Sequence, residues 1–160
     1  MSESEKKEKY LAGIISDTHG MLRSGIYEAF KEVDLIVHAG DVGSREVLKE
    51  LEKIAPVTAV QGNMDGRWAS NLQPTEIVQI GEVQFYVLHD LWLLDLDPKT
   101  AGFHAVISGH THKPKIEHKD GILYLNPGSA GPRRFDYPIS AALLEIQGTR
   151  LHPRIVEFAP

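Results

Sequence analysis

Cysteine is absent from the 160-residue sequence, and long apolar runs are absent as well. The missing cysteine excludes disulfide bonds and thiolate ligands, so any metal ion must be held by oxygen atoms and imidazole nitrogens. This disfavours a structural zinc site, whose ligands usually include cysteine. The apolar runs are far too short to span a bilayer, so we expect no membrane partner.

The sequence also lacks an excess of positive charge. It has 17 Lys and Arg against 22 Asp and Glu, a formal net charge of −5. A nonspecific nucleic-acid binder needs a basic surface, so long DNA or RNA is not the expected partner. The first residues carry mixed charge without the apolar core of a secretion signal. We therefore expect a disordered tail at residues 1–9 and a single domain at residues 10–160 of a cytoplasmic protein.

Five strand-like runs each end in a side chain that can bind a metal ion. The runs cover residues 10–16, 33–39, 57–60, 83–88 and 105–108. The polar residues that follow them are Asp17, His19, Asp41, Asn63, His89, His110 and His112. Ligand sites of open α/β sheets are built at strand ends, and glycines beside most of these residues let the backbone come close. The pattern indicates one shared metal site.

Each of these residues also has an ordinary structural interpretation. Asp17 could cap a turn, Asp41 and Asn63 could be turn residues, and His89 could be a buried histidine with a hydrogen-bond partner. Their concentration at five strand ends favours the shared site over separate explanations. The remaining histidines are not expected to be ligands. His38 is expected to support the site, and surface or core positions are expected for His104, His118 and His152.

The order of elements predicts an α/β protein. Early strands alternate with helices expected at 24–32, with Ser24 as N-cap, and after Ser44. Later strands are joined by turns, in hairpins expected at 76–80 with 83–88, 115–118 with 121–126, and 140–146 with 151–158. Residues 91–97 are ambiguous, and 98–102 are expected to form one helical turn. This pattern is typical of two sheets packed face to face and covered by helices.

At the strand ends the sequence resembles the calcineurin-like metallophosphoesterase superfamily, and its small bacterial and archaeal phosphodiesterases in particular. The matching motifs, in order, are Asp17-Thr18-His19, Gly40-Asp41, Gly62-Asn63-Met64-Asp65, His89 and Gly109-His110-Thr111-His112. All five in this order are highly specific, and they extend over nearly the whole chain. The resemblance implies a four-layer α/β/β/α sandwich of two mixed sheets with flanking helices.

The resemblance also implies a dinuclear site. Asp17, His19 and His112 would hold one metal ion, Asn63, His89 and His110 the other, and Asp41 would bridge them. A hydroxide between the two ions would attack the phosphorus of a small phosphoester. Imidazole and oxygen ligands suit Mn, Fe, Ni, Zn or Co better than Mg or Ca, and manganese is the first expectation.

Two departures from the family pattern bear on the reaction. Met64 stands where many phosphomonoesterases carry a histidine that can act as general acid, and Ser44-Arg45 replaces an Asp-Arg pair. We therefore expect weak protonation of the leaving group and a preference for phosphodiesters. Asp41, Asn63 and Arg45 are the expected catalytic residues.

Arginines and tryptophans near the motifs are candidates for substrate contacts. Arg45, Arg133 and Arg134 could bind phosphate through bidentate contacts, although each could equally be an exposed surface charge. For Trp68 and Trp92, core packing or an oligomer contact is favoured over stacking on a nucleoside.

Three functions remain open at this level. A dinuclear phosphodiesterase is the first, a nuclease is a second enzymatic alternative, and a non-catalytic scaffold for protein assembly is the third. The complete set of seven ligand positions favours an enzyme, and the acidic composition disfavours a nuclease. The motifs leave the natural substrate and a homo-oligomeric state undetermined.

Overall fold

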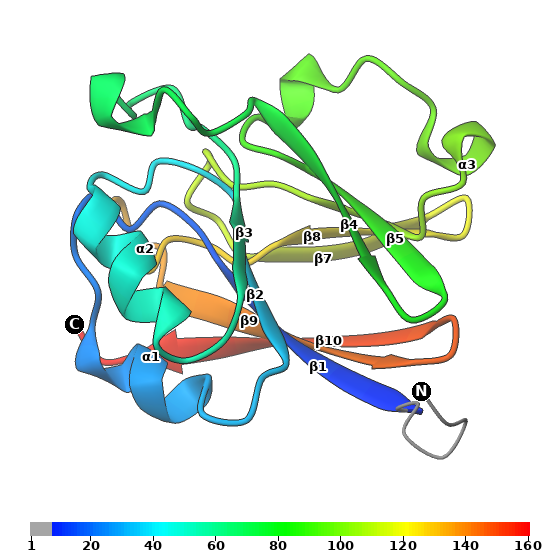
Figure 1. The fold of residues 1–160 in the computed structure, drawn as a ribbon, viewed down its shortest axis with the longest axis horizontal. Coiled ribbons are helices and arrows are strands. Elements are labelled where there is room, and N and C mark those ends of the chain that lie inside the picture. Colours follow the sequence, from blue (N-terminus) through cyan, green and yellow to red (C-terminus); the bar gives the residue numbers. More distant parts are fainter. Residues whose placement is uncertain (1–7) are drawn as a thin grey trace.

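The computed structural model describes residues 8–160, which fold into two five-stranded mixed sheets (Figure 1). The first sheet has the order β10-β9-β1-β2-β3. Its strands are β1 (Lys9–Ile15), β2 (Leu35–His38), β3 (Val57–Ala59), β9 (Ile139–Gln147) and β10 (Arg150–Phe158). Strand β1 is central, since it pairs in parallel with β2 and antiparallel with β9. The expected hairpin at the end of the chain is the pair β9 and β10.

The second sheet has the order β4-β5-β6-β8-β7. Its strands are β4 (Thr75–Ile80), β5 (Val83–Leu88), β6 (Ala105–Ile107), β7 (Lys115–Lys119) and β8 (Ile122–Asn126). Strands β5, β6 and β8 run in parallel, while β4 and β7 close hairpins at the two edges. The expected mixture of parallel pairs and hairpins is confirmed in both sheets.

Apolar side chains from the facing sides of the two sheets form the central core. Ile14 and Val37 of the first sheet meet Phe85, Ile107 and Leu125 of the second within one buried cluster. Strands covered on both faces need nearly continuous apolar runs, which explains why these strands lack clean alternation.

Helices cover the outer face of the first sheet. Helices α1 (Ser24–Ala29) and α2 (Arg45–Glu52) lie together beside it (Figure 1). Ile26 and Leu51 from these helices pack in a second buried cluster that includes Phe30 and Ile36. Helix α2 follows Ser44 as predicted. Helix α1 is shorter than expected, ends before Phe30, and has Arg23 rather than Ser24 at its N-cap position.

The outer face of the second sheet is covered by the segment between β5 and β6, from which Leu94, Leu96 and Phe103 pack against it. This segment contains η3 (Leu91–Leu93), where the prediction was ambiguous, and α3 (Pro98–Ala101), where one helical turn was expected. A third cluster joins Tyr86, Phe103 and Val106 on this side. The molecule is therefore an α/β/β/α sandwich with a thin fourth layer. A further turn, η2 (Arg67–Ala69), precedes β4.

The predicted tail at residues 1–9 falls largely outside the described residues. Lys9, which was assigned to that tail, instead begins β1 and pairs with Gln147 of β9. The described residues contain no helix that is long and apolar enough to cross a membrane.

Candidate metal centre

The seven predicted ligands come from loops at the carboxyl ends of strands in both sheets. Asp17 and His19 follow β1, and Asp41 and Asn63 follow β2 and β3. His89 follows β5, and the pair of His110 and His112 follows β6. Parallel strands bring their carboxyl ends to the same sheet edge, and the face-to-face packing brings the two edges together. As a result, contacts shorter than 4 Å connect all seven side chains.

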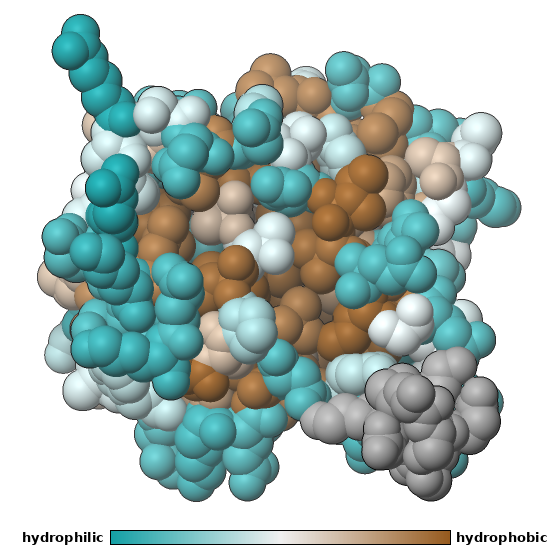
Figure 2. All heavy atoms as spheres, viewed as in Figure 1, coloured by the Kyte–Doolittle hydropathy of each residue, from teal (hydrophilic) through white to brown (hydrophobic). Residues whose placement is uncertain are grey.

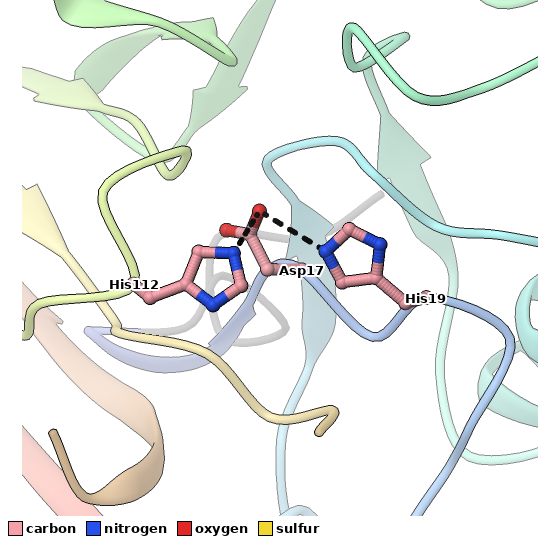
Figure 3. A group of neighbouring side chains, drawn as sticks. All are labelled: Asp17, His19 and His112. Carbon is pink, nitrogen blue, oxygen red and sulfur yellow. Dashed lines mark ion pairs between the residues drawn. The ribbon is translucent and has the colours of Figure 1, made fainter. Parts of the chain in front are cut away.

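Asp17 is fully buried between two histidines (Figure 3). Its Oδ2 accepts hydrogen bonds from the Ser16 hydroxyl at 2.6 Å and from the His110 backbone N–H at 3.1 Å. Its Oδ1 lies 3.4 Å from Nε2 of His112 and 3.8 Å from Nε2 of His19. One oxygen is thus fixed by the protein, while the other faces the imidazoles.

Buried polar atoms without hydrogen bonds mark the same place. Among the described residues four buried side-chain atoms lack a hydrogen-bond partner, and three of them are Oδ1 of Asp17, Nε2 of His19 and Nδ1 of His112. Buried polar groups are almost always paired, because leaving one unpaired costs about 1–3 kcal/mol. Of these, Oδ1 of Asp17 and Nε2 of His19 face each other at 3.8 Å, and Nε2 of His112 lies 3.4 Å from the same oxygen. A carboxylate oxygen and imidazole nitrogens are donor atoms that a divalent transition metal accepts. The residues present therefore fit a metal ion.

Asp41 occupies the position between the two halves of the site. Its Oδ1 accepts the backbone N–H of Met64 at 2.8 Å. Its Oδ2 lies 3.2 Å from Nε2 of His89 and 3.8 Å from Nε2 of His19. A carboxylate in contact with imidazoles of both halves has the placement that a bridging ligand needs.

His89, His110 and Asn63 form the second half. Nδ1 of His110 lies 3.3 Å from both Oδ1 of Asn63 and Nε2 of His89. Nδ1 of His89 lies 2.8 Å from the carbonyl oxygen of Ala39. A carbonyl can only accept, so Nδ1 of His89 carries the proton in the neutral ring and Nε2 presents its lone pair to the site.

The backbone of the site is held in an unfavourable conformation. Of the seven non-glycine residues with positive φ in the described chain, five are candidate ligands: Asp17, His19, Asp41, His110 and His112. Such conformations cost about 1 kcal/mol or more per residue and persist where the surrounding structure imposes them. Their concentration at one place indicates a functional site.

His38 supports the loops that carry the candidate ligands, as expected, and is fully buried. Its Nδ1 accepts the Gly40 backbone N–H at 3.1 Å, so Nε2 carries the proton and donates to the Thr18 hydroxyl at 3.0 Å. That hydroxyl in turn donates to the carbonyl of Val42 at 2.7 Å. Burial, with the nearby His89 adding to it, lowers the pKa of His38 to about 3. The neutral ring therefore ties the loop after β1 to the loop after β2.

Burial and charge oppose one another at the candidate ligands. Burial raises the pKa of Asp17 above its usual range. Burial would also raise the pKa of Asp41, but the contacts from His89 and the Met64 N–H bring it below its ordinary value. Burial disfavours the charged form of His89, yet the Asp41 carboxylate raises the pKa of that ring above its ordinary value. In the described residues, the ion pairs of these two buried carboxylates are with histidines.

Asp65 has a role that sequence reasoning did not assign. Its carboxylate accepts the backbone N–H groups of Gly62 at 2.9 Å, Gly43 at 3.0 Å and Val42 at 3.2 Å. It therefore holds the loop of Asp41 against the loop of Asn63. The available signal was its place two residues after Asn63 in the family motif.

The predicted arginines lie at different distances from this centre. Arg134 is near enough that its charge, after burial, contributes to lowering the pKa of His112. Arg133 donates from Nε to the carbonyl of Tyr137 at 3.3 Å, and Arg45 donates to the carbonyl of Trp68 at 3.0 Å. All three are exposed, and the contacts described for Arg133 and Arg45 are to backbone carbonyls.

The two tryptophans differ. Trp68 is half-buried against the helix-side cluster, so its expected core packing is confirmed. Trp92, in η3, is 92% exposed, so of the two favoured alternatives core packing is wrong for this residue and an oligomer contact stays a prediction. Short helical turns cannot bury every side chain, and Trp92 projects from one of them.

Comparison with known proteins identifies the family to which this fold belongs. The family model of the calcineurin-like phosphoesterase superfamily domain matches residues 11–149, and the chain belongs to that family. Among its relatives, a “Probable metallophosphoesterase” of Methanothermobacter thermautotrophicus is 35% identical over 91% of both chains. A phosphodiesterase of Methanocaldococcus jannaschii is 34% identical over 72% of this chain and 81% of the relative.

A similar solved structure is that of vacuolar protein sorting 29 from Cryptosporidium parvum. It has a TM-score of 0.77 at 24% sequence identity, covering 96% of this chain and 100% of the other. At this identity the likeness shows the fold alone. The predicted fold class and family are therefore both confirmed.

Proposed function

We propose that this protein is a dinuclear, metal-dependent phosphodiesterase acting on small phosphoesters. The observation that carries the proposal is the meeting of Asp17, His19 and His112 beside Asp41, where Oδ1 of Asp17 and Nε2 of His19 are buried without hydrogen bonds. His89, His110 and Asn63 gather on the other side of Asp41. The phosphodiesterase of M. jannaschii supports the choice of substrate class.

The proposed ligand sets follow the two halves. Asp17, His19 and His112 would hold one ion, Asn63, His89 and His110 the other, and Asp41 both. Asp17, His19 and His112 form one compact group of possible ligand atoms, which supports the first set. A second compact group joins Asp41 and His89 to Asp17, which the proposal assigns to the first ion. When bound, two divalent ions would supply an activated water and stabilise the charge of an in-line displacement at phosphorus. Manganese is proposed first, with Fe, Ni, Zn and Co as alternatives, because the donors are imidazole and oxygen.

The chain's own residues would position the phosphate and limit proton transfer. Arg134 offers positive charge beside His112, and Arg45 and Arg133 are proposed as weaker phosphate contacts. Met64 is 66% exposed beside Asn63 and has no proton to donate. A leaving group would therefore take its proton from water, which favours diesters with good leaving groups. Asn63 and Arg45 remain proposed as catalytic together with Asp41.

The proposal is tested by hydrolysis of bis(p-nitrophenyl) phosphate. Metal-free protein is titrated with Mn, Ni, Zn and Mg, and bound metal is counted by mass spectrometry. We expect activity with about two ions per chain, and a loss of about 100-fold or more in Asp41→Asn. A wild type that binds no metal, or an equally active Asp41→Asn variant, would overturn the proposal. Met64→His should raise activity on poor-leaving-group monoesters if the missing acid is limiting.

A scaffold without catalysis is the second candidate. It is favoured by the fold of the vacuolar sorting protein and by apolar surface such as Trp92 and Leu93, which are 92% and 72% exposed. A scaffold does not require five candidate ligands with positive φ or buried polar atoms without hydrogen bonds beside them, so an enzyme remains the conclusion. A nuclease is disfavoured by the net charge of −5.

A further inference from the structure

A cavity of about 680 Å³ opens beside the His89 and His110 half of the candidate metal centre. Residues that line it include Asp90, Trp92, Thr111, Lys113, Tyr124 and Tyr137. Cavities of this size hold ligands of about nucleotide size. The cavity is distinct from the ligand cluster itself, because none of the seven candidate ligands is among its lining residues.

Asp90 connects the cavity to the metal centre. Its Oδ2 lies 3.8 Å from Nε2 of His110, and its Oδ1 accepts the backbone N–H of Trp92 at 3.1 Å. Gly109, which also lines the cavity, donates its N–H to the carbonyl of His89 at 2.9 Å. The cavity wall therefore begins one side chain away from the candidate ligands. A phosphoester held at those ligands would have this cavity as the space next to it.

Trp92 stands at this cavity with its indole almost entirely in water. Its exposed fraction is 92%, the highest among the large apolar residues of the described chain. Figure 2 shows apolar surface in the upper part of the view, over the segment that carries η3. Full exposure forgoes the stabilisation that burying a large apolar side chain provides. An aromatic ring left exposed beside a cavity is suited to stacking on a planar ligand.

The rest of the lining combines aromatic and polar residues with Leu91 and Leu125. Tyr137 comes from the loop of the two adjacent arginines, and its carbonyl accepts from Arg133. Tyr124 adds a second ring, and Lys113 and Asn126 add hydrogen-bonding groups. An aliphatic chain would leave these polar groups without partners, whereas a heteroaromatic base has a flat face for the rings and polar edges for the side chains.

We propose that this cavity is a nucleobase subsite and that Trp92 contributes its stacking surface. The substrate class of the phosphodiesterase is then a small nucleotide ester, with its phosphate at the metal ligands and its base in the cavity. This inference rests on the proposed function for the identity of the reacting group. Binding of the base itself is testable separately.

The test is binding of adenosine 5′-monophosphate and ribose 5-phosphate, which share the phosphate and differ in the base. The sequence has two tryptophans, so Trp68→Phe leaves Trp92 as the single indole. In that background adenosine monophosphate should quench the fluorescence and ribose 5-phosphate should not. By calorimetry on protein with Trp68 intact, adenosine monophosphate should bind about tenfold or more tightly than ribose 5-phosphate.

Trp92→Ala should remove most of this tenfold preference. The matched control is Leu93→Ala, since Leu93 is 72% exposed in the same turn but does not line the cavity. Equal binding of the two ligands, or an unchanged preference in Trp92→Ala, overturns the subsite. Hydrolysis of bis(p-nitrophenyl) phosphate by the same preparations separates the two proposals. If the protein hydrolyses this diester but binds the two phosphates equally, the subsite alone is refuted. If it prefers adenosine monophosphate but does not hydrolyse the diester, the subsite is supported and the phosphodiesterase is refuted.

Discussion

Oδ2 of Asp41 lies 3.2 Å from Nε2 of His89, although Asp41 follows a strand of the first sheet and His89 follows a strand of the second. The candidate centre is therefore built across the junction of two sheets. Each sheet contributes ligands that meet those of the other sheet only when the two sheets pack together. The stability of the sandwich and the assembly of the site are consequently coupled. Substitutions at four residues test this coupling.

Asp17→Asn is expected to change stability and metal binding in opposite directions. Asp17 is fully buried, and its Oδ1 lacks a hydrogen-bond partner. Removing a buried charge should stabilise the metal-free protein by about 1 kcal/mol or more, while metal affinity falls. Thermal unfolding with chelator and with added Mn measures both effects. A metal-free variant less stable than wild type would contradict the idea that this carboxylate is kept for its ligand.

Asp65→Asn is expected to loosen the loops that carry Asp41 and Asn63. The carboxylate of Asp65 accepts three backbone N–H groups, and an amide cannot replace both of its oxygens. We expect a loss of about 1–3 kcal/mol in the free energy of unfolding and a fall of about tenfold or more in metal affinity. Denaturant titration and metal titration test this. Asp95→Asn makes the same change at an exposed position and should leave both quantities unchanged.

Gly109→Ala is expected to disrupt the site by steric overlap. A Cβ at this position would lie 2.0 Å from Oγ of Ser16 and 2.7 Å from Oδ2 of Asp17. The displaced atoms include a candidate ligand, so we expect about 1–3 kcal/mol of destabilisation together with weaker metal binding. Gly66→Ala is the control, because no atom lies within 4 Å of its Cβ. Equal behaviour of the two variants in denaturation and metal titration would show that the close approach is unimportant.

His38 is expected to make the metal-free protein less stable in mild acid. The unfolded chain protonates this histidine below about pH 6.5, whereas the folded chain keeps it neutral down to about pH 3. Between these values the unfolded state binds more protons, so the free energy of unfolding falls as pH falls. The contribution is at most about 1.4 kcal/mol per pH unit. The charged groups that face the ring are His89, Asp41 and His19, so the comparison is made with chelator present.

Denaturant unfolding from pH 7 to pH 4 measures this slope. His38→Asn keeps an acceptor for the Gly40 N–H and removes the titrating ring, so its stability should depend less on pH than that of wild type. His118→Asn, at an exposed position, should follow wild type. An equal slope in wild type and His38→Asn would show that the ring is protonated in the folded protein.

Much of the architecture was predictable because it depends on local pattern. The apolar runs and the turn residues between them predicted the strands of both sheets, and the polar residues at strand ends predicted which side chains the packing brings together. Errors occurred where local signals were weak. Ser24 did not cap α1, since Arg23 takes the N-cap position and the helix lacks a side-chain cap. Lys9 joined β1 because pairing with β9 extends the strand beyond its apolar residues.

The sequence by itself determined which side chains could bind metal and which strands would carry them, since both follow from residue type and spacing along one chain. Only the tertiary structure decided that Asp65 ties two ligand loops together, that His38 is neutral, and that Trp92 faces a cavity instead of the core. These properties depend on burial and on partners distant in sequence. Neither is encoded in a local pattern, because both arise only when the two sheets pack.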